Sequence, residues 1–298
     1  MKAEGATTKR MTTVLREMLA GSKILVYPGV YDALSAKIAE RVGFQLVGLG
    51  GYALGAHLGT SESLLNLEDV TRTCRYITAA INIPLKADAG AGFGEPLHVM
   101  RTIRELEIAG AAAVHIEDQI YPKRAHYHKG IEHVIAAEAM VAKLKAAVAA
   151  RRDHDFVIIA RTDAMRTDGF AEGVRRANLY LEAGADMAYV YPNTVEETRQ
   201  APKEIRGPLV YSNSEGNLVG RPLFSVQELE DLGYKMVSYA ASCINVAAKA
   251  MKEILETLKS TGQTGVDQEE IRKARKYMED TLGFEKMYKL EMETVEGG

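Results

Sequence analysis

The segment Ile108-Ala-Gly-Ala-Ala-Ala-Val-His-Ile116 contains the pattern that decides the fold. A helical pattern ends at Gly110, and an apolar run follows at once. Glycine tolerates the left-handed conformation that stops a helix. A continuous apolar run is typical of a strand buried on both faces, as in a parallel sheet. The segment therefore predicts a helix that leads directly into a buried parallel strand.

The same pattern occurs at three other places along the chain. There the helical patterns end at Gly43, Gly184 and Gly233, and each glycine precedes an apolar run. Four more apolar runs predict the remaining buried strands, at Ile24–Tyr27, Ile83–Ala87, Phe156–Ala160 and Pro208–Tyr211. Eight strands that alternate with helix-length segments predict a (β/α)8 barrel, also called a TIM barrel. An open doubly wound sheet is less favoured, because no Gly-x-Gly-x-x-Gly fingerprint follows the first strand.

Two more helices are expected beyond the eighth strand, at Ile244–Leu258 and Glu269–Leu290. The segment Ser260–Val266 between them is rich in Ser, Thr and Gly, which is typical of a linker. The last helix could therefore reach away from its own barrel. We expect one barrel domain over residues 1–298, in which residues 244–298 form a C-terminal helical extension.

The composition excludes several classes of function. A formal net charge of -3 gives no broad basic field, which argues against a nucleic-acid partner. Two cysteines make no disulfide framework, which fits a reducing compartment. No apolar run approaches the ~20 residues needed to span a bilayer, and no secretory signal is visible. We therefore expect a cytoplasmic protein without a membrane partner.

Polar residues follow several of the predicted strands at the point where each strand ends. Asp88 follows the third strand, Glu117 the fourth and Arg161 the fifth. In (β/α)8 barrels the functional residues lie in the loops after the strands, so these side chains should meet at one mouth. Carboxylates suit a divalent cation, and a guanidinium can hold a substrate carboxylate by two hydrogen bonds.

These segments resemble the isocitrate lyase/phosphoenolpyruvate mutase superfamily. The similarity is collinear from about Met11 through Tyr239, and its motifs are Leu25–Ser35, Asp88-Ala-Gly-Ala-Gly-Phe-Gly94, His115-Ile-Glu-Asp-Gln119 with Pro122-Lys-Arg124, and Ile158-Ile-Ala-Arg-Thr-Asp163. The resemblance implies a Mg2+-dependent barrel, in which Mn2+ can substitute. Its substrates would be small 2-hydroxy or 2-oxo di- or tricarboxylates, which react through a metal-stabilised enolate. The resemblance also implies a homo-oligomer, a dimer or tetramer, that exchanges C-terminal helices between subunits.

The resemblance assigns roles to particular residues. Asp88 and Glu117 would hold the cation, directly or through water. Lys123 and Arg124 would lie on a lid that closes over the substrate and excludes water. The expected substrate contacts are Gly50, Gly51, Arg161, Asn213 and Glu215.

The chain departs from the family pattern at several positions. Gly90 stands where the family has a second metal-region Asp, and Ser61, or Glu62 if a gap is allowed, aligns with an upstream Asp. Ala125 replaces the cysteine that protonates the departing enolate in the lyases, and Tyr191 replaces a sixth-strand Glu. The proton-transfer role would then pass to one of three neighbours of Ala125, which are His126, Tyr127 and His128.

We therefore expect a carbon–carbon lyase or decarboxylase. Two alternatives stay open. One is a phosphonate-type mutase or hydrolase on the same site, although the altered lid argues against the standard mutase. The other is a non-catalytic barrel that binds carboxylates, and metal affinity would distinguish such a scaffold from an enzyme.

Overall fold

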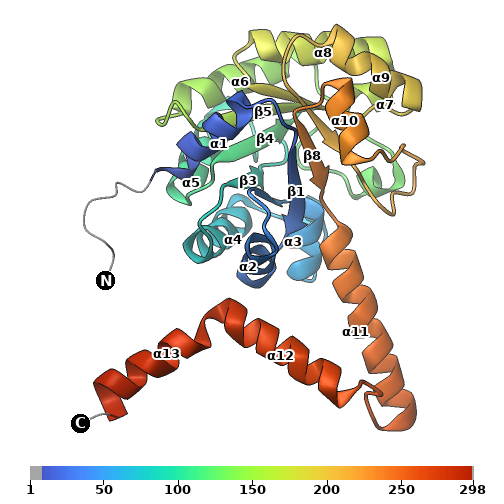
Figure 1. The fold of residues 1–298 in the computed structure, drawn as a ribbon. Helices are drawn as coiled ribbons and strands as arrows, with labels where there is room; N and C mark the ends of the chain where they lie inside the picture. The colour runs from blue at the N-terminus through green and yellow to red at the C-terminus, as the bar shows by residue number, and fades with distance from the viewer. Residues whose placement is uncertain (1–8, 297–298) are drawn as a thin grey trace.

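The computed structural model describes residues 9–296. Eight parallel strands close into a barrel in sequence order, so that the first strand pairs with both the second and the eighth (Figure 1). The strands are β1 (Leu25–Val30), β2 (Val47–Leu49), β3 (Leu85–Asp88), β4 (Ala113–Glu117), β5 (Val157–Thr162), β6 (Met187–Val190), β7 (Leu209–Ser212) and β8 (Met236–Tyr239). The predicted (β/α)8 barrel is confirmed.

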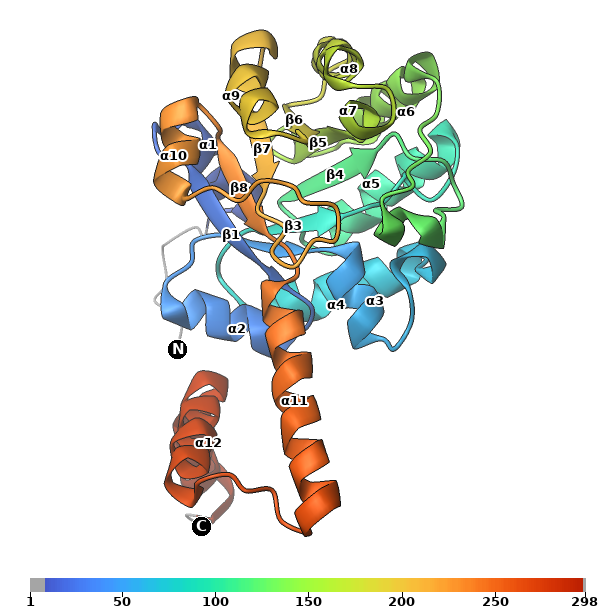
Figure 2. The ribbon, with the colours of Figure 1, turned by 90° about the vertical axis from the view of Figure 1, so that its right-hand side faces the viewer.

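Helices surround the barrel on its outside (Figure 2). They are α2 (Ala33–Val42), α3 (Gly51–His57), α4 (Leu67–Ala80), α5 (Pro96–Ile108), α6 (Ala137–Ala150), α7 (Ala164–Thr167), α8 (Phe170–Glu182), α9 (Val195–Glu204) and α10 (Val226–Leu232). Gly43 ends α2 with a φ of 109°, and Gly110 lies beyond the end of α5 with a φ of 84°. Both angles lie in the left-handed region that favours glycine, so these two glycines end their helices as expected.

The strands divide their side chains between the two sides of the barrel wall. In β4, Val114 and Ile116 pack in the apolar layer under the helices, whereas Ala113 belongs to the apolar interior of the barrel. Alternation along the strand places His115 and Glu117 on the interior side as well. An additional helix that the sequence did not predict, α1 (Met11–Ala20), packs Leu15 into the same interior cluster. The two faces of β4 thus belong to different apolar clusters, one in the barrel interior and one under the helices.

The C-terminal helices form an arm that projects from the barrel (Figures 1 and 2). The arm consists of α11 (Ser242–Thr261), α12 (Gln268–Leu282) and α13 (Phe284–Glu291). The prediction of a single helix over Glu269–Leu290 is wrong, because Gly283 takes a φ of 80° and separates α12 from α13. The arm returns to its own barrel where Arg41 of α2 lies 3.8 Å from Asp280 and 4.9 Å from the ring centre of Tyr277. Among the described residues, no helix is both long and apolar enough to cross a membrane.

Candidate active site

The carboxyl ends of the strands surround a cavity of about 440 Å3. The first and the last strand both contribute to its lining, with Tyr27 on β1 and Ser238 on β8. Parallel strands deliver their carboxyl ends to one side of a barrel, so residues far apart in sequence meet here. Six of the predicted site residues line the cavity, namely Gly50, Gly51, Asp88, Tyr127, Arg161 and Glu215.

Asp88 stands at the end of β3 and is surrounded by donors. Its Oδ2 accepts a hydrogen bond from the Gly51 amide at 3.0 Å, and its Oδ1 accepts one from the Gly90 amide at 2.8 Å. Burial alone would raise the pKa of Asp88, but contact with the His115 imidazole, whose Nε2 lies 3.1 Å from Oδ1, and the ammonium groups of Lys123 and Lys86 hold it well below its ordinary value. Asp88 is therefore an anion at neutral pH.

Asp88, His115 and Glu117 form a compact buried set. Each offers one ligand atom, and these three atoms lie within 4.8 Å of one another. Burial lowers the pKa of His115, so its imidazole is neutral at neutral pH and is a suitable metal ligand. Two carboxylates and one neutral imidazole are a donor set that can hold a divalent cation. The structure brings the predicted ligands Asp88 and Glu117 together, and their role stays a prediction.

Glu117 is fully buried beneath the cavity. Within the described residues, neither of its carboxylate oxygens has a hydrogen-bond partner of good geometry. The nearest charged groups are the Lys123 ammonium, 2.8 Å from Oε1, and the Arg161 guanidinium, 3.0 Å from Oε2. A buried carboxylate held only by such ion pairs retains capacity to accept a further cation or a donor.

Arg161 connects the acidic set to the loop that follows β4. Besides Glu117, its guanidinium contacts Asp163 at 3.0 Å and donates to the Tyr127 hydroxyl at 2.8 Å. The carbon at the centre of the guanidinium lies 4.5 Å from the ring centre of Tyr191. Although Arg161 is almost fully buried, it lines the cavity. Its contact with a substrate carboxylate stays a prediction.

The predicted lid is the loop between β4 and α6, residues 118–136. Lys123 reaches inward from it and contacts Glu62, the residue offered in place of the family's upstream Asp. Burial would lower the pKa of Lys123, but the carboxylates of Glu117 and Glu62 hold it well above its ordinary value. Lys123 is therefore a permanent cation that ties this loop to the loop after α3.

The other predicted lid residues lie in different environments. Tyr127 lines the cavity, and its ring centre is 4.2 Å from the Lys123 ammonium. Arg124 and His126 are exposed and do not line the cavity. The side chain of His128 lies outside the described part of the structure. Of these residues, Tyr127 is the one that the structure brings next to Arg161.

The loop between β7 and α10, residues 213–225, covers one side of the cavity. Asn213 fastens this loop, since its amide donates to the Phe224 carbonyl at 2.7 Å and to the Tyr239 hydroxyl at 3.0 Å. Asn213 does not line the cavity, whereas Glu215 does and accepts a hydrogen bond from Ser242. The expected substrate contact of Asn213 stays a prediction, and its observed bonds indicate a role in holding the loop.

Several cavity residues lie inside strands, where a search of strand ends does not find them. Lys86 on β3 contacts the His115 ring, and its ammonium lies 5.8 Å and 5.6 Å from the ring centres of Tyr27 and Tyr189. Burial lowers the pKa of Lys86 to about 7. The sequence feature that indicates Lys86 is a charged residue inside an otherwise apolar strand, because such a side chain requires a partner in the barrel interior.

The fold and this site together define a (β/α)8 barrel whose mouth carries buried carboxylates among fixed cations. The family model described as phosphoenolpyruvate phosphomutase matches residues 15–259. The chain therefore belongs to this family, within the phosphoenolpyruvate mutase/isocitrate lyase superfamily. The predicted membership is confirmed.

Relatives extend along most of the chain. The 2,3-dimethylmalate lyase of Eubacterium barkeri is 38% identical over 280 residues, which are 93% of this chain and 96% of that protein. The 2-methylisocitrate lyase of Aeropyrum pernix is 39% identical over 256 residues, 85% of this chain and 82% of that protein. Because the relatives are named as lyases of this superfamily, the prediction of an enzyme is confirmed.

Solved structures agree with this relationship. A crystal structure of 2,3-dimethylmalate lyase aligns with a TM-score of 0.87 at 30% identity, and the alignment covers 96% of both chains. Phosphonopyruvate hydrolase in complex with oxalate and Mg2+ aligns with a TM-score of 0.83 at 27% identity, over 96% of this chain and 100% of the other. The likeness extends through the C-terminal arm as well as the barrel.

Proposed function

We propose that this chain is a Mg2+-dependent carbon–carbon lyase or decarboxylase that acts on a small 2-hydroxy or 2-oxo di- or tricarboxylate. The observation that carries the proposal is the buried set of Asp88, His115 and Glu117 beside a cavity that Arg161 also lines. The names of the relatives, lyases of dimethylmalate and methylisocitrate, support the choice of substrate class.

The residues present fit a divalent cation. Asp88 and Glu117 supply oxygen atoms of the kind that Mg2+ and Mn2+ prefer, and the Glu117 oxygens are engaged by ion pairs with Lys123 and Arg161. His115 adds a neutral imidazole. When bound there, Mg2+ would supply positive charge beside the oxygen on which an enolate develops its negative charge. Gly90 offers no side-chain ligand, so this chain would hold the cation with fewer carboxylates than the family pattern.

The chain's own residues would position the substrate around that cation. Arg161 would bind one substrate carboxylate through its Nε, which has no hydrogen-bond partner among the described residues, and backbone amides near Gly50 would assist. Lys123, fixed between Glu62 and Glu117, would hold the lid over the cavity and exclude water. In the cleavage of a 2-hydroxy acid, the hydroxyl loses its proton as it becomes a carbonyl. The electron pair of the broken carbon–carbon bond then forms an enolate that requires a proton.

We propose Tyr127 as the residue that delivers this proton. Its hydroxyl accepts a hydrogen bond from Arg161, and its side chain lines the cavity, where a substrate can reach it. Burial raises the pKa of Tyr127, which keeps the phenol protonated at neutral pH. Arg161 and Lys123 both lie beside the ring and would stabilise the phenolate that remains after proton transfer. We therefore assign the role of the missing lyase cysteine to Tyr127.

Tyr127→Phe is expected to lower kcat/KM by about 100-fold, the lower range for loss of a general acid. His126→Ala is the matched comparison, because His126 is exposed on the same short helix, Ala125–Lys129, and should leave kcat/KM near the parent value. Both would be measured by steady-state kinetics, together with His128→Ala. Full activity in Tyr127→Phe, combined with a loss in either histidine variant, would transfer the role to that histidine.

The function itself is tested by release of pyruvate or glyoxylate from a panel of 2-hydroxy and 2-oxo di- and tricarboxylates. We expect turnover with Mg2+ that EDTA abolishes and excess Mg2+ or Mn2+ restores. Phosphonopyruvate belongs in the panel, because the similarity to phosphonopyruvate hydrolase makes phosphonate hydrolysis the second candidate. No turnover together with no calorimetric cation binding would refute both enzymatic proposals and leave a non-catalytic barrel.

We also propose that the chain forms a dimer or tetramer in which the C-terminal extension is exchanged between subunits. Met251, Ile254, Leu255 and Leu258 are exposed on α11 at spacings of three and four residues, so they form one apolar stripe. Exposed apolar stripes of this kind mark contact surfaces. The two free cysteines, Cys74 and Cys243, are compatible with a cytoplasmic location, which we propose as well.

Leu255→Glu is expected to lower the molar mass in solution, because it places a charge in the middle of this stripe. Light scattering coupled to size exclusion would measure it. Lys249→Glu is the control, since 100° per residue places Lys249 on the opposite face of α11. An unchanged mass in Leu255→Glu, or an equal decrease in both variants, would contradict assembly through the stripe.

A further inference from the structure

Arg221 is a cation of the cavity wall that the proposed mechanism does not use. It lies in the β7–α10 loop and lines the same cavity as Asp88 and Arg161. Two of its guanidinium nitrogens, Nε and Nη1, are buried without a hydrogen-bond partner among the described residues. A guanidinium has five N–H donors and no way to lose its charge in a protein. Among the described residues, these N–H groups of Arg221 at the cavity wall have no acceptor, so they can donate to a ligand.

The other arginines of the cavity are neutralised by carboxylates. Arg161 contacts both Glu117 and Asp163 at 3.0 Å, and Arg166 contacts Glu132 at 2.8 Å. For Arg221, the described residues provide no such ion pair, and its contact is with an aromatic ring. Arg221 is partly buried, and a charge withdrawn from water without a counter-ion is costly. An incoming anion would neutralise this cation.

Tyr191 fixes the position of Arg221 relative to Arg161. The guanidinium carbon of Arg221 lies 4.6 Å from the ring centre of Tyr191, and that of Arg161 lies 4.5 Å from the same point. The two guanidinium carbons are therefore no farther apart than the sum of these two distances. A phenol cannot neutralise either cation, because burial raises the pKa of Tyr191 well above its ordinary value. Two positive groups thus share one wall of a small cavity.

The geometry points to Arg221 as a specificity-determining residue that binds the distal carboxylate of a short dicarboxylate. Arg161 and the Asp88 set would hold the reacting end of the substrate, and this part of the inference rests on the proposed function. The second carboxylate would extend towards Arg221 and accept two hydrogen bonds from it. Arg221 would thereby select dicarboxylates over monocarboxylates and over substrates whose distal group is neutral.

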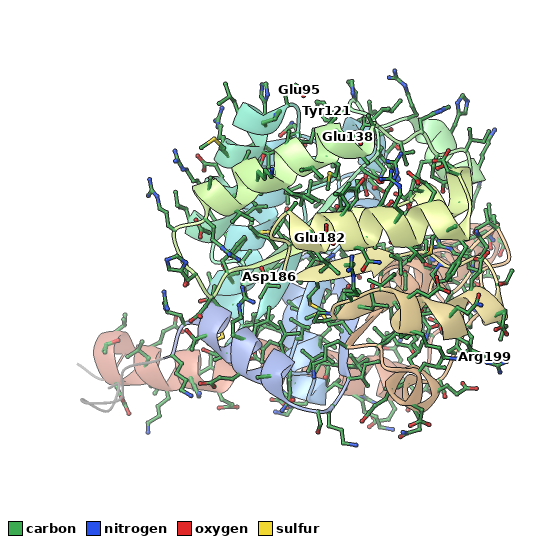
Figure 3. The ribbon with its side chains drawn as sticks, turned by 90° about the horizontal axis from the view of Figure 1, so that it is seen from above. Glu95, Tyr121, Glu138, Glu182, Asp186 and Arg199 are labelled. Carbon is green, nitrogen blue, oxygen red and sulfur yellow. The ribbon has the colours of Figure 1, made fainter. Side chains whose placement is uncertain are left out.

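Three probes separate the two ends of the site. Oxalate carries its carboxylates on adjacent carbons and tests the reacting end. Malate is a 2-hydroxy acid with a distal carboxylate, and the 4-amide of malate has a neutral amide in place of that carboxylate. Calorimetric titration of each probe into the full chain with Mg2+ would be compared for the parent, Arg221→Met, Arg221→Lys and Arg199→Met. Arg199 is the matched control, because it is exposed at the periphery of the molecule on α9 (Figure 3).

We expect Arg221→Met to weaken malate binding by about 10- to 100-fold, as a charged hydrogen-bonded contact warrants. Oxalate affinity should stay at the parent value, and the preference of the parent for malate over its 4-amide should disappear. Arg221→Lys should restore part of that preference, since it restores charge without the two-pronged geometry. Arg199→Met should match the parent with all three probes. The ratio of the affinities for malate and its 4-amide measures specificity. A merely structural defect would weaken both ligands alike and leave this ratio unchanged.

The outcomes distinguish this inference from the proposed function. If the parent binds oxalate and malate but Arg221→Met retains the preference for malate over the amide, the role of Arg221 is refuted while the proposed function stands. If the parent binds malate without oxalate and Arg221→Met loses malate, Arg221 is confirmed as a carboxylate site and the proposed reacting end is wrong. If the parent binds none of the probes, both proposals fail.

Discussion

Asp88→Asn is expected to lower kcat/KM by about 10³-fold and to remove measurable Mg2+ binding. The asparagine side chain has nearly the same shape but no charge, so the cation would lose its most exposed anionic ligand. A catalytic metal contributes several kcal/mol to transition-state stabilisation, and each 1.36 kcal/mol corresponds to a factor of ten in rate. Steady-state kinetics and calorimetric titration with Mg2+ would measure the two losses separately.

Asp231→Asn serves as the control, because Asp231 is exposed on α10, away from the cavity lining. It should match the parent in activity and in cation affinity. Thermal unfolding of Asp88→Asn would test whether the fold survives, since the single amide oxygen of the new side chain can still accept from the amide of Gly51 or of Gly90. Undiminished Mg2+ affinity in a folded Asp88→Asn protein would mean that the cation binds elsewhere.

Asp118→Ala is expected to lower the free energy of unfolding by about 3 kcal/mol, as loss of one partner from a buried ionic network does. Asp118 is fully buried on the helix side of β4. Its carboxylate accepts hydrogen bonds from Thr162 at 2.7 Å, Tyr180 at 2.9 Å and Arg176 at 3.2 Å. The main-chain amide of Asp163 adds a fourth at 3.1 Å. Removing the acceptor leaves several buried donors without a partner, and each unpaired donor lowers the stability of the fold.

The midpoint of urea unfolding would measure this loss, with Asp231→Ala as the exposed control. Asp118 and Glu117 are neighbours in sequence on opposite sides of the barrel wall, so Mg2+ affinity should stay at the parent value in Asp118→Ala. An unfolding midpoint equal to that of the parent would show that the network contributes little. Lost cation affinity in a stable protein would place Asp118 in the metal site instead.

The sequence was sufficient to predict the barrel and one part of the site. Gly43 and Gly110 mark where helices stop and buried strands follow, and strand ends in a barrel must meet. Asp88, Glu117 and Arg161 could therefore be grouped without any knowledge of distances. Their grouping follows from topology, because each stands where a strand ends.

Other parts of the site depend on which face of a strand a side chain occupies. Lys86 and His115 lie within apolar runs, and only the register of the closed barrel directs them inward. Arg221 lies in a loop whose course is fixed by bonds between Asn213 and Phe224, eleven positions apart. The break at Gly283 was also missed, since a glycine within a helical pattern can either continue the helix or end it.

Closure of the barrel has a consequence for how the protein behaves at high concentration. Each strand from β1 to β8 is paired on both sides, so the sheet has no edge strand with unpaired backbone groups. Edge strands are the usual template for uncontrolled pairing between chains and for fibrils. Within the described residues, the apolar surface available for self-association is concentrated on the helical arm, for example at Val246 and Leu255. Aggregation of this protein should therefore begin between side chains of helices and leave the sheet intact.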